Sequence, residues 1–390
     1  MSHRRERYLI DIIIKKLKFS PVVAIQGARQ TGKSFLVKNI LSESFKELKY
    51  CTFDKSSDRD FAEANPDSFI AQYADAKPLV IDEAQKVARI FDSVKAAVDE
   101  IRVPGKFVLL GSTEFSKLHK IRESLTGRLS KARLFPLTLT ESLSKDCTKS
   151  RSAFFSSLKT LASREELVRF LSRGGLPGIF AVREASERDS LLNDWLELTI
   201  ERDIHLFPAV KFDSNLARKI ILAVVNLNYP DLNSIAKFCS KDSRVVQRHL
   251  EALSTLFVFN KLNPHPSGTG KPIYFLCDVA LATMLGASFE KQLYTWAVHE
   301  IFAKQSYLDQ YKNNYYFYRN AKGSLIHLIE ESQELSALKI LPTERVTKKD
   351  LYLLQALKNK LPKIKLYALG ASYQVWKDEK VIVLPWESLA

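Results

Sequence analysis

The stretch Gly27-Ala28-Arg29-Gln30-Thr31-Gly32-Lys33-Ser34 decides how this chain is interpreted. It matches the phosphate-loop pattern G-x-x-x-x-G-K-[ST] at every fixed position. The apolar residues 22–25 before it predict a buried parallel strand, and residues 35–41 after it predict the start of a helix. In that setting, backbone N–H groups and the positive end of the helix surround one anion. The stretch therefore predicts a binding site for a nucleoside triphosphate.

A second motif predicts the metal and the attacking water. Residues 77–81 form an apolar strand that ends in Asp82-Glu83, the form of a Walker B element. We expect Lys33 to reach the β- and γ-phosphates, and Ser34 and Asp82 to hold Mg²⁺, which keeps several of its own waters. Glu83 would then polarise the attacking water. The alternative is that Asp82-Glu83 caps a helix, but the nearby phosphate loop favours the Walker B interpretation.

A third apolar strand, residues 105–110, runs into Gly111-Ser112-Thr113. Ser112 or Thr113 suits a sensor that bonds the γ-phosphate or the attacking water, although an ordinary strand-to-loop turn has the same sequence character. Residues 48–54 predict one more strand. Alternating strands and helices indicate an α/β fold with a parallel sheet, whose ligand binds at the carboxyl ends of the strands.

Composition limits the classes of protein and partner. With 390 residues the chain predicts two or three domains. The formal net charge of +15 favours a polyanionic partner, nucleic acid first and an anionic membrane second, although a basic surface also serves solubility alone.

The cysteines and the N-terminus indicate a cytoplasmic setting. Cys51, Cys147, Cys239 and Cys277 form no C-x-x-C pair, so neither a zinc site nor a disulfide framework is expected. Residues 4–17 read as an amphipathic helix packing on the core rather than a signal peptide, since an aspartate interrupts the apolar run. No stretch approaches the ~20 apolar residues of a membrane span.

Beyond residue 141 the pattern becomes helical, and residues 223–273 suggest a winged helix. Residues 232–239 and 243–253 predict two helices joined by a polar turn, followed by a hairpin. Four residues of the second helix are expected to face the core: Val245, Val246, Leu250 and Leu253. This leaves Arg244, Gln247 and Arg248 outward as candidates for DNA contact, although many winged helices serve only as packing modules.

Together these motifs resemble a widespread family of bacterial and archaeal AAA+ ATPases that join a P-loop module to a poorly characterised C-terminal region. The resemblance rests also on Gly127-Arg128, Phe135-Pro136-Leu137, Gly174-Gly175-Leu176-Pro177 and Asp278. It implies an AAA+ P-loop ATPase core over residues 1–141, a helical lid or linker over 142–222, a winged helix over 223–273 and a restriction-endonuclease-like α/β domain over 274–390.

The resemblance also implies that the last domain has no remaining nuclease activity. Its metal site needs a helix Glu, a strand Asp and a Glu-x-Lys. The corresponding positions here hold Tyr294 with Glu290 nearby, His327, and Ala337 with Lys339, so only the lysine is retained. Lysines in this domain, Lys348 and Lys349 first, could bind DNA phosphates or simply form a solvated face.

AAA+ assemblies complete one subunit's site with an arginine from its neighbour. Arg128 is the first candidate and Arg122 the second; an ordinary salt bridge or a DNA contact is the alternative. This role implies a homo-oligomer.

We therefore expect an ATP-hydrolysing, Mg²⁺-dependent AAA+ ATPase that acts as a DNA-binding motor or remodeller on branched or forked DNA. The alternative is an ATP-driven switch whose C-terminal domains bind a protein partner. His327 and Ala337 disfavour a third class, an active ATP-dependent nuclease.

Overall fold

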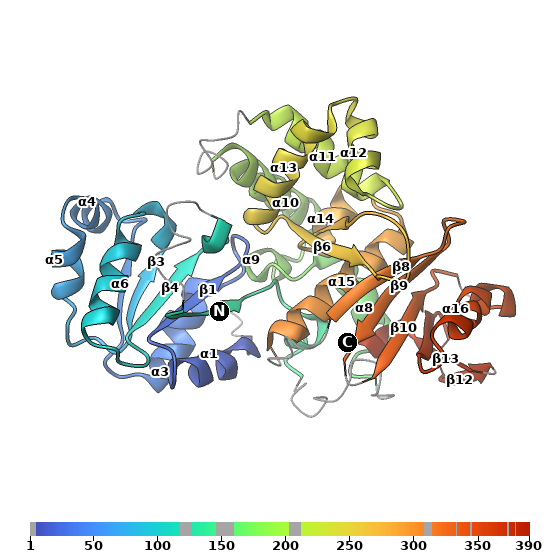
Figure 1. Ribbon diagram of the computed structural model, residues 1–390, viewed down its shortest axis with the longest axis horizontal. Helices are drawn as coiled ribbons and strands as arrows, with labels where there is room; N and C mark the ends of the chain where they lie inside the picture. The colour runs from blue at the N-terminus through green and yellow to red at the C-terminus, as the bar shows by residue number, and fades with distance from the viewer. Residues whose placement is uncertain are drawn as a thin grey trace.

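The computed structural model describes residues 5–117, 127–145, 160–202, 212–307, 314–332, 334–343, 345–372, 374–378 and 380–390. Two bodies are visible in Figure 1. An N-terminal α/β module lies on one side. A larger body on the other side carries a helical unit above a second sheet.

The N-terminal module is built on a parallel sheet. Its strands are β1 (Val22–Gln26), β2 (Lys49–Thr52), β3 (Leu79–Asp82), β4 (Phe107–Gly111) and β5 (Leu129–Arg133), in the order β2-β3-β4-β1-β5. All four neighbouring pairs are parallel. This confirms the predicted parallel sheet and its first four strands. The sequence did not predict β5, because this edge strand carries only two apolar residues among polar ones and so lacks a buried-strand signal.

Helices cover both faces of this sheet. They are α1 (Leu9–Leu17), α2 (Lys33–Leu36) continuing through η1 (Val37–Leu41) into α3 (Ser42–Ser44), α4 (Ser56–Ala64), α5 (Pro66–Ala71), η2 (Ala84–Lys86), α6 (Ile90–Glu100) and η3 (Phe115–Lys117). The short α7 (Leu139–Ser142) follows β5, and its Leu139 packs in the core of the C-terminal part. The helix expected after the phosphate loop is present. The amphipathic α1 packs its apolar face, including Leu9, Ile13 and Leu17, in one core with β1 and β5, which confirms its expected place on the module.

The helical unit follows. It contains α8 (Arg164–Arg173), α9 (Pro177–Phe180), α10 (Ala185–Glu201), α11 (Ser214–Asn226), α12 (Leu232–Cys239), α13 (Ser243–Thr255), the antiparallel hairpin β6 (Phe259–Pro264) and β7 (Ile273–Leu276), and α14 (Val279–Met284). The predicted two helices and hairpin are therefore present. The assignment of residues 223–273 as a winged helix remains a prediction.

One expectation about α13 is wrong. Val246, Leu250 and Leu253 are buried as predicted, but Val245 is 38% exposed. Residues 246, 250 and 253 follow the 3.6-residue helical period and form one stripe. Val245 lies about 100° from its neighbour Val246 and points away from that stripe.

The C-terminal part has the element order α15 (Phe289–Tyr307), β8 (Asn314–Arg319), β9 (Leu325–Glu331), β10 (Leu335–Ile340), α16 (Lys348–Lys360), β11 (Lys365–Gly370), β12 (Trp376–Asp378), β13 (Val381–Pro385) and η6 (Trp386–Leu389). Its sheet runs β12-β13-β11-β10-β9-β8-β6-β7. The hairpin thus joins the C-terminal sheet through short parallel pairing of Asn263 with Tyr316. The sequence predicted no such continuity. The domain boundaries and the restriction-endonuclease-like assignment remain predictions.

A buried junction ties these parts together. The Gly175 N–H donates to Asp278 Oδ2 at 2.6 Å, and the Leu137 N–H donates to the Gly175 carbonyl at 2.6 Å. Three motifs that are distant in sequence therefore meet at one point.

Cys51, Cys239 and Cys277 are buried free thiols, while Cys147 lies outside the described residues. Among the described helices, none is long and apolar enough to cross a membrane.

Candidate nucleotide-binding site

The phosphate loop connects β1 to α2 at the carboxyl edge of the sheet. Gly32 has φ of 91°, a left-handed conformation that favours glycine. A Cβ on Gly27 would lie 2.0 Å from the carbonyl oxygen of Leu134, just after β5, so only glycine fits there. These backbone constraints explain why the two glycines stand at these spacings.

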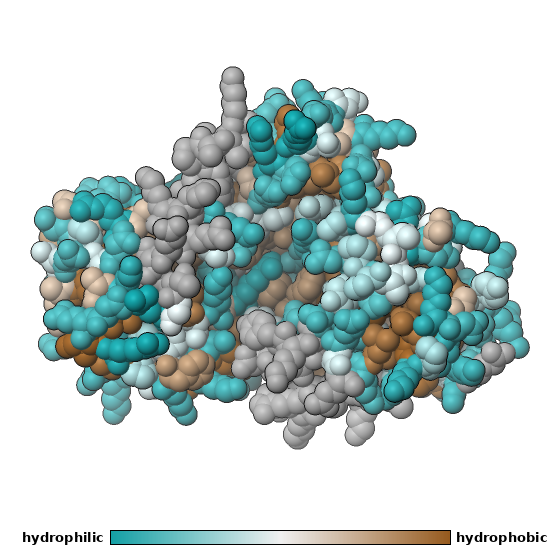
Figure 2. All heavy atoms as spheres, viewed as in Figure 1, coloured by the Kyte–Doolittle hydropathy of each residue, from teal (hydrophilic) through white to brown (hydrophobic). Residues whose placement is uncertain are grey.

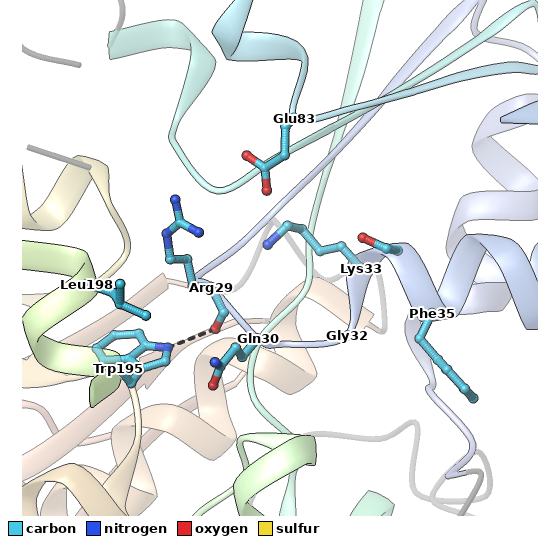
Figure 3. Close-up of a pocket in the computed structure, with 9 residues that line it drawn as sticks. Arg29, Gln30, Gly32, Lys33, Phe35, Glu83, Trp195 and Leu198 are labelled. Carbon is cyan, nitrogen blue, oxygen red and sulfur yellow. Dashed lines mark hydrogen bonds between the residues drawn. The ribbon is translucent and has the colours of Figure 1, made fainter. Parts of the chain in front are cut away.

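Lys33 is buried inside the loop. Its Nζ donates to the carbonyl oxygens of Gly27 and Ala28 at 2.9 and 2.8 Å. Figure 3 shows the side chains of Lys33, Arg29 and Glu83 pointing toward a common space. That space is a cavity of about 200 Å³. Its walls include Gln30, Gly32 and Ser34 of the predicted phosphate-binding stretch, whereas Thr31 is fully buried beneath the loop.

Asp82 lies at the end of β3, facing the start of α2. Ser34 Oγ donates to Asp82 Oδ2 at 2.5 Å, and the Tyr50 hydroxyl donates to the same oxygen. The Glu83 N–H donates to Asp82 Oδ1 at 2.9 Å. The structure therefore brings together the two residues predicted to hold Mg²⁺. A hydroxyl and a carboxylate are the hard oxygen donors that this ion prefers.

Tyr50 was not predicted as part of the site. Burial and then its hydrogen bond to Asp82 raise the pKa of its hydroxyl, so it stays a neutral donor at neutral pH. Only the pairing of β2 with β3, which sets Tyr50 beside Val80, brings it to the site. Strand pairing of this kind is not visible in a local motif.

Glu83 has a left-handed backbone with φ of 54°. Its Oε2 accepts from Gln85 Nε2 and from Ser112 Oγ, the latter at 3.3 Å, while Gln85 also donates to Ser112 Oγ at 3.1 Å. Non-glycine residues in this conformation are uncommon and occur often at functional sites. Gln85, for which the sequence predicted no role, connects the two predicted residues.

Of the two sensor candidates, only Ser112 contacts Glu83. Thr113 is fully buried, and its hydroxyl has no hydrogen-bond partner in the described part of the chain. Its carbonyl instead accepts from Gln26 Nε2 at 2.8 Å. The geometry therefore favours Ser112 over Thr113 as the sensor.

Two residues of α10 that no motif predicted also line the cavity. Trp195 Nε1 donates to the carbonyl of Arg29 at 3.1 Å, and Leu198 lines the cavity beside it (Figure 3). Both come from a helix more than 160 residues beyond the loop, so only folding places them there.

Arg7 supports the loop from beneath and was also not predicted. Its Nη1 donates to the Thr31 carbonyl at 2.7 Å, and its Nη2 donates to the Phe135 carbonyl at 2.6 Å. Its Nε pairs with the buried Glu141 at 3.1 Å. The Tyr307 hydroxyl, from α15, accepts from Arg7 at 3.1 Å. The phosphate loop is therefore in contact with the C-terminal part through one buried arginine.

Arg128 lies away from its own subunit's cavity. It directly precedes β5, whose first residue pairs with Val22 at the start of β1, whereas the phosphate loop follows the end of β1. Its guanidinium pairs with Asp99, with Nε–Oδ1 of 2.5 Å and Nη2–Oδ2 of 2.9 Å. A role in hydrolysis would require a neighbouring subunit. The second candidate, Arg122, lies outside the described residues.

The predicted DNA-contact residues are exposed. Arg244, Gln247 and Arg248 lie on the outer side of α13, and Gln247 donates to Glu251 at 2.9 Å. Lys348 and Lys349 are exposed at the start of α16.

Two further lysines of the C-terminal part form an ion pair or a hydrogen bond within the chain. Lys365 pairs with Glu334 at 2.5 Å, and Lys358 donates to the Ile364 carbonyl. Fewer of these lysines are therefore free for phosphates than the sequence suggested.

The residues at the positions that correspond to a nuclease metal site, His327, Glu290 and Lys339, make contacts that differ from those of metal ligands. His327 is buried, with Nε2 3.8 Å from Glu290 Oε1, and its Nδ1 accepts from the Ile340 N–H at 2.9 Å. Lys339 Nζ donates to the Asp350 carbonyl at 2.8 Å. In the described ranges, no three His, Cys, Asp or Glu side chains gather closely enough to hold a metal ion.

The comparison with known families covers the part of the chain that holds the cavity. Residues 19–143 match the AAA domain family. This range contains the phosphate loop, Asp82, Glu83, Ser112 and Arg128. The N-terminal module is thus a P-loop domain of AAA type.

Two mycobacterial proteins, both named as uncharacterized, are similar to part of this chain. Proteins of Mycobacterium bovis and Mycobacterium tuberculosis are each 26% identical over 259 residues, which is 66% of this chain and 53% of theirs. The chain thus spans about half the length of these curated relatives.

Two solved archaeal structures are also similar. A Walker-type ATPase of Pyrococcus abyssi has a TM-score of 0.42 at 12% identity, covering 70% of this chain and 93% of that one. A signal transduction ATPase with numerous domains and a tetratricopeptide repeat sensor, from Pyrococcus horikoshii, has a TM-score of 0.28 at 12% identity, covering 75% of this chain and 45% of that one.

Proposed function

We propose that the protein hydrolyses ATP in the cavity at the carboxyl ends of β1, β3 and β4. The observation that carries this proposal is the meeting of Ser34, Asp82, Glu83 and Ser112 beside the buried Lys33. These residues come from separate strand ends, and each has the chemistry that phosphoryl transfer needs at its position.

Each side chain has a separate task in this proposal. Lys33 offsets phosphate charge, and Ser34 with Asp82 would hold Mg²⁺, which neutralises charge on the phosphates when bound. Glu83 orients and polarises the attacking water. Ser112 and Gln85 fix the Glu83 carboxylate through their hydrogen bonds. Trp195 and Leu198 exclude water on the lid side.

The direct test is phosphate release from ATP by the purified full-length protein. Hydrolysis should require Mg²⁺ and stop when EDTA is added. Absence of release with Mg²⁺ present, from a protein shown to be folded by its cooperative thermal transition, would contradict the proposal.

We further propose that Arg128 acts on the site of a neighbouring subunit in a homo-oligomer. We expect Arg128→Ala to lower kcat by about 10³-fold with little change in ATP affinity, because such an arginine contributes mainly to transition-state charge. The matched control is Asp99→Ala, which breaks the same ion pair but keeps the arginine.

Mixing provides the decisive measurement for Arg128. A Lys33→Ala subunit should supply its arginine to the intact site of an Arg128→Ala subunit, so mixtures should recover part of the hydrolysis rate. If the two variants co-assemble and no mixing ratio recovers activity, the arginine does not act between subunits.

For the partner, we propose nucleic acid, with branched or forked DNA as the substrate of an ATP-driven motor or remodeller. The net charge of +15 and the exposed Arg244, Arg248, Lys348 and Lys349 support this. The C-terminal lobe would then hold DNA without cutting it. Stimulation of ATP hydrolysis by junction, fork, duplex and single-stranded DNA would rank the substrates.

One observation favours the alternative, a switch that binds a protein partner. Three apolar side chains on the consecutive helices α11, α12 and α13 are partly exposed to solvent. Leu222 is 39% exposed, Phe238 is 47% exposed and Val245 is 38% exposed. Exposed apolar groups of this kind suit a protein interface. Binding that hardly changes with salt would favour this alternative, since phosphate contacts weaken steeply as salt rises.

A further inference from the structure

A second and larger cavity lies between the AAA domain and the rest of the molecule. It encloses about 1050 Å³ and is bounded by β5, the C-terminal half of α13, β6 and α15; we refer to it as the central groove. In Figure 2 the surface is hollowed at this place, between the N-terminal module and the C-terminal body. It is separate from the nucleotide cavity, and the two share no lining residue.

The groove is strongly basic. Its walls carry two carboxylates, Glu114 and Glu251, and Glu251 already accepts a hydrogen bond from Gln247. The same walls carry six cationic side chains: Lys117, Lys131, Arg133, Arg248, Lys261 and Lys271. Except for Arg133, all of these cations belong to exposed residues, so they form a rim around it.

Arg133 is the least exposed of these cations. Its guanidinium lies over the rings of Phe135 and Phe257, 4.2 and 4.8 Å from their centroids. Within the described residues, no carboxylate pairs with it; its Nη2 donates to Asn260 Oδ1 at 2.8 Å. Burial lowers the pKa of Arg133 to about 10, so it remains cationic at neutral pH. The Glu114 carboxylate attracts it only from beyond ion-pair distance, and a half-buried cation without a direct ion pair favours binding of a further anion.

Asn260, the hydrogen-bond partner of Arg133, has a donor group that no described residue uses. This residue is 1% exposed, and its Nδ2 has no hydrogen-bond partner in the described ranges. Most buried polar groups in proteins have such a partner. Within the described part of the chain, two residues that line the same cavity therefore keep unused capacity, a guanidinium without an ion pair and an amide N–H group without a hydrogen bond, and both groups are suited to a phosphate oxygen.

The size and the apolar groups identify the class of ligand. The cavity is at the upper limit of pockets for small molecules, and its cations extend well beyond what one phosphate would need. Half-buried Tyr274 and Phe302 add aromatic surface to the wall. Cations that follow a backbone and rings that stack on bases are the combination that binds single-stranded nucleic acid.

The groove is also connected to the ATPase machinery. Gln26, the residue before the phosphate loop, lines the groove and donates to the Thr113 carbonyl at 2.8 Å. The Glu114 N–H donates to the carbonyl of Thr255, the last residue of α13, at 2.9 Å. A ligand that moves α13 or β5 would therefore move the loop that carries Ser112.

We propose that the central groove binds a single nucleic-acid strand, with Arg133 and Asn260 on a phosphate, and that this binding regulates ATP hydrolysis through the Ser112–Glu114 loop. The proposal rests on the proposed ATPase function and names its nucleic-acid site. It differs from the outward face of α13 inferred from sequence, of which only Gln247 and Arg248 reach the groove.

The test titrates the protein into a fluorescently labelled oligo(dT) of 20 nucleotides and measures fluorescence anisotropy in the absence of ATP. Arg133→Met should weaken binding at least tenfold, because it removes the cation proposed to pair with a phosphate. It also removes the donor to Asn260 Oδ1, so Tm is measured beside affinity to show that the variant is folded. The matched control, Arg169→Met, removes an equal charge from an exposed site on α8 and should change affinity less than twofold. Oligo(dT) should stimulate ATP hydrolysis by the wild type but not by Arg133→Met.

Should Arg133→Met fail to fold, the exposed rim variant Lys131→Glu/Lys261→Glu replaces it. It should weaken binding at least tenfold and lower the slope of log K against log salt by about 0.7 for each phosphate that the protein no longer neutralises. If both variants bind oligo(dT) as tightly as the wild type, the central groove is not the binding site, although nucleic acid remains a partner. Equal competition by polyglutamate would overturn nucleic acid as its ligand. Because binding is measured without ATP, loss of the proposed hydrolysis would appear separately in the wild-type assay.

Discussion

Glu83→Gln is expected to bind ATP as tightly as the wild type and to hydrolyse it at least ~100-fold more slowly. A residue that acts as a general base contributes typically 10²–10⁴-fold to the rate. The amide keeps the size of the side chain and an oxygen for Gln85 and Ser112, but it cannot polarise the water. ATP should therefore remain bound and uncleaved, which a filter-retention assay with labelled ATP measures directly.

Lys33→Ala is expected to have the opposite effect, a loss of ATP binding. Lys33 acts on the phosphates in the ground state, so its loss should weaken ATP binding at least ~100-fold, consistent with charge-assisted hydrogen bonds of about 1.5–3 kcal/mol each. Glu100→Gln, an exposed carboxylate at the end of α6, is the control and should behave as the wild type. Hydrolysis by Glu83→Gln at the wild-type rate would show that Glu83 is not the residue that activates water.

Gly174→Ala should destabilise the protein by at least ~3 kcal/mol. Gly174 has φ of 66° and ψ of −161°, a region that only glycine occupies readily, where other residues are strained by about 1–3 kcal/mol. An added Cβ would also lie 2.0 Å from Asp278 Oδ1 and 2.7 Å from Ala280 Cβ. Asp278 cannot move aside without losing its hydrogen bonds to the Gly175 and Ala280 N–H groups.

A control of the same chemistry lies four residues further on. Gly178 is in the short helix α9, and nothing lies within 4 Å of a Cβ placed there. Gly178→Ala should be neutral or slightly stabilising, since alanine favours a helix by up to about 1 kcal/mol over glycine. Thermal unfolding of both variants measures the contrast. A Gly174→Ala protein that unfolds at the wild-type temperature would mean that the junction with Asp278 tolerates displacement.

The sequence alone predicted the AAA-type module because the information is contiguous. A phosphate loop needs glycines, a lysine and a serine at fixed spacing, between a strand and a helix, and eight neighbouring residues carry all of it. Walker B and the strand leading to Ser112 are also local patterns, each an apolar run ending in small or acidic residues. For the same reason the sequence did not predict β5, whose polar composition gives no such signal although pairing with β1 holds it in the sheet.

On α13, residue type alone does not predict which side chains are buried. Val245 and Val246 are chemically identical, yet one is exposed and the other buried, because each successive residue turns the helix by about 100°.

Only the tertiary structure decided which distant residues complete the two cavities. Trp195 reaches the candidate nucleotide site from helix α10, Tyr50 reaches it from the adjacent strand β2, and Arg7 reaches it from the N-terminal segment. The central groove likewise exists only where β5, α13, β6 and α15 come together. The residues that line it come from segments far apart in the sequence, and no local pattern among them predicts which segments meet. Long-range packing, driven by burial of apolar surface that is indifferent to sequence separation, sets those contacts, whereas fixed local backbone geometry sets the phosphate loop.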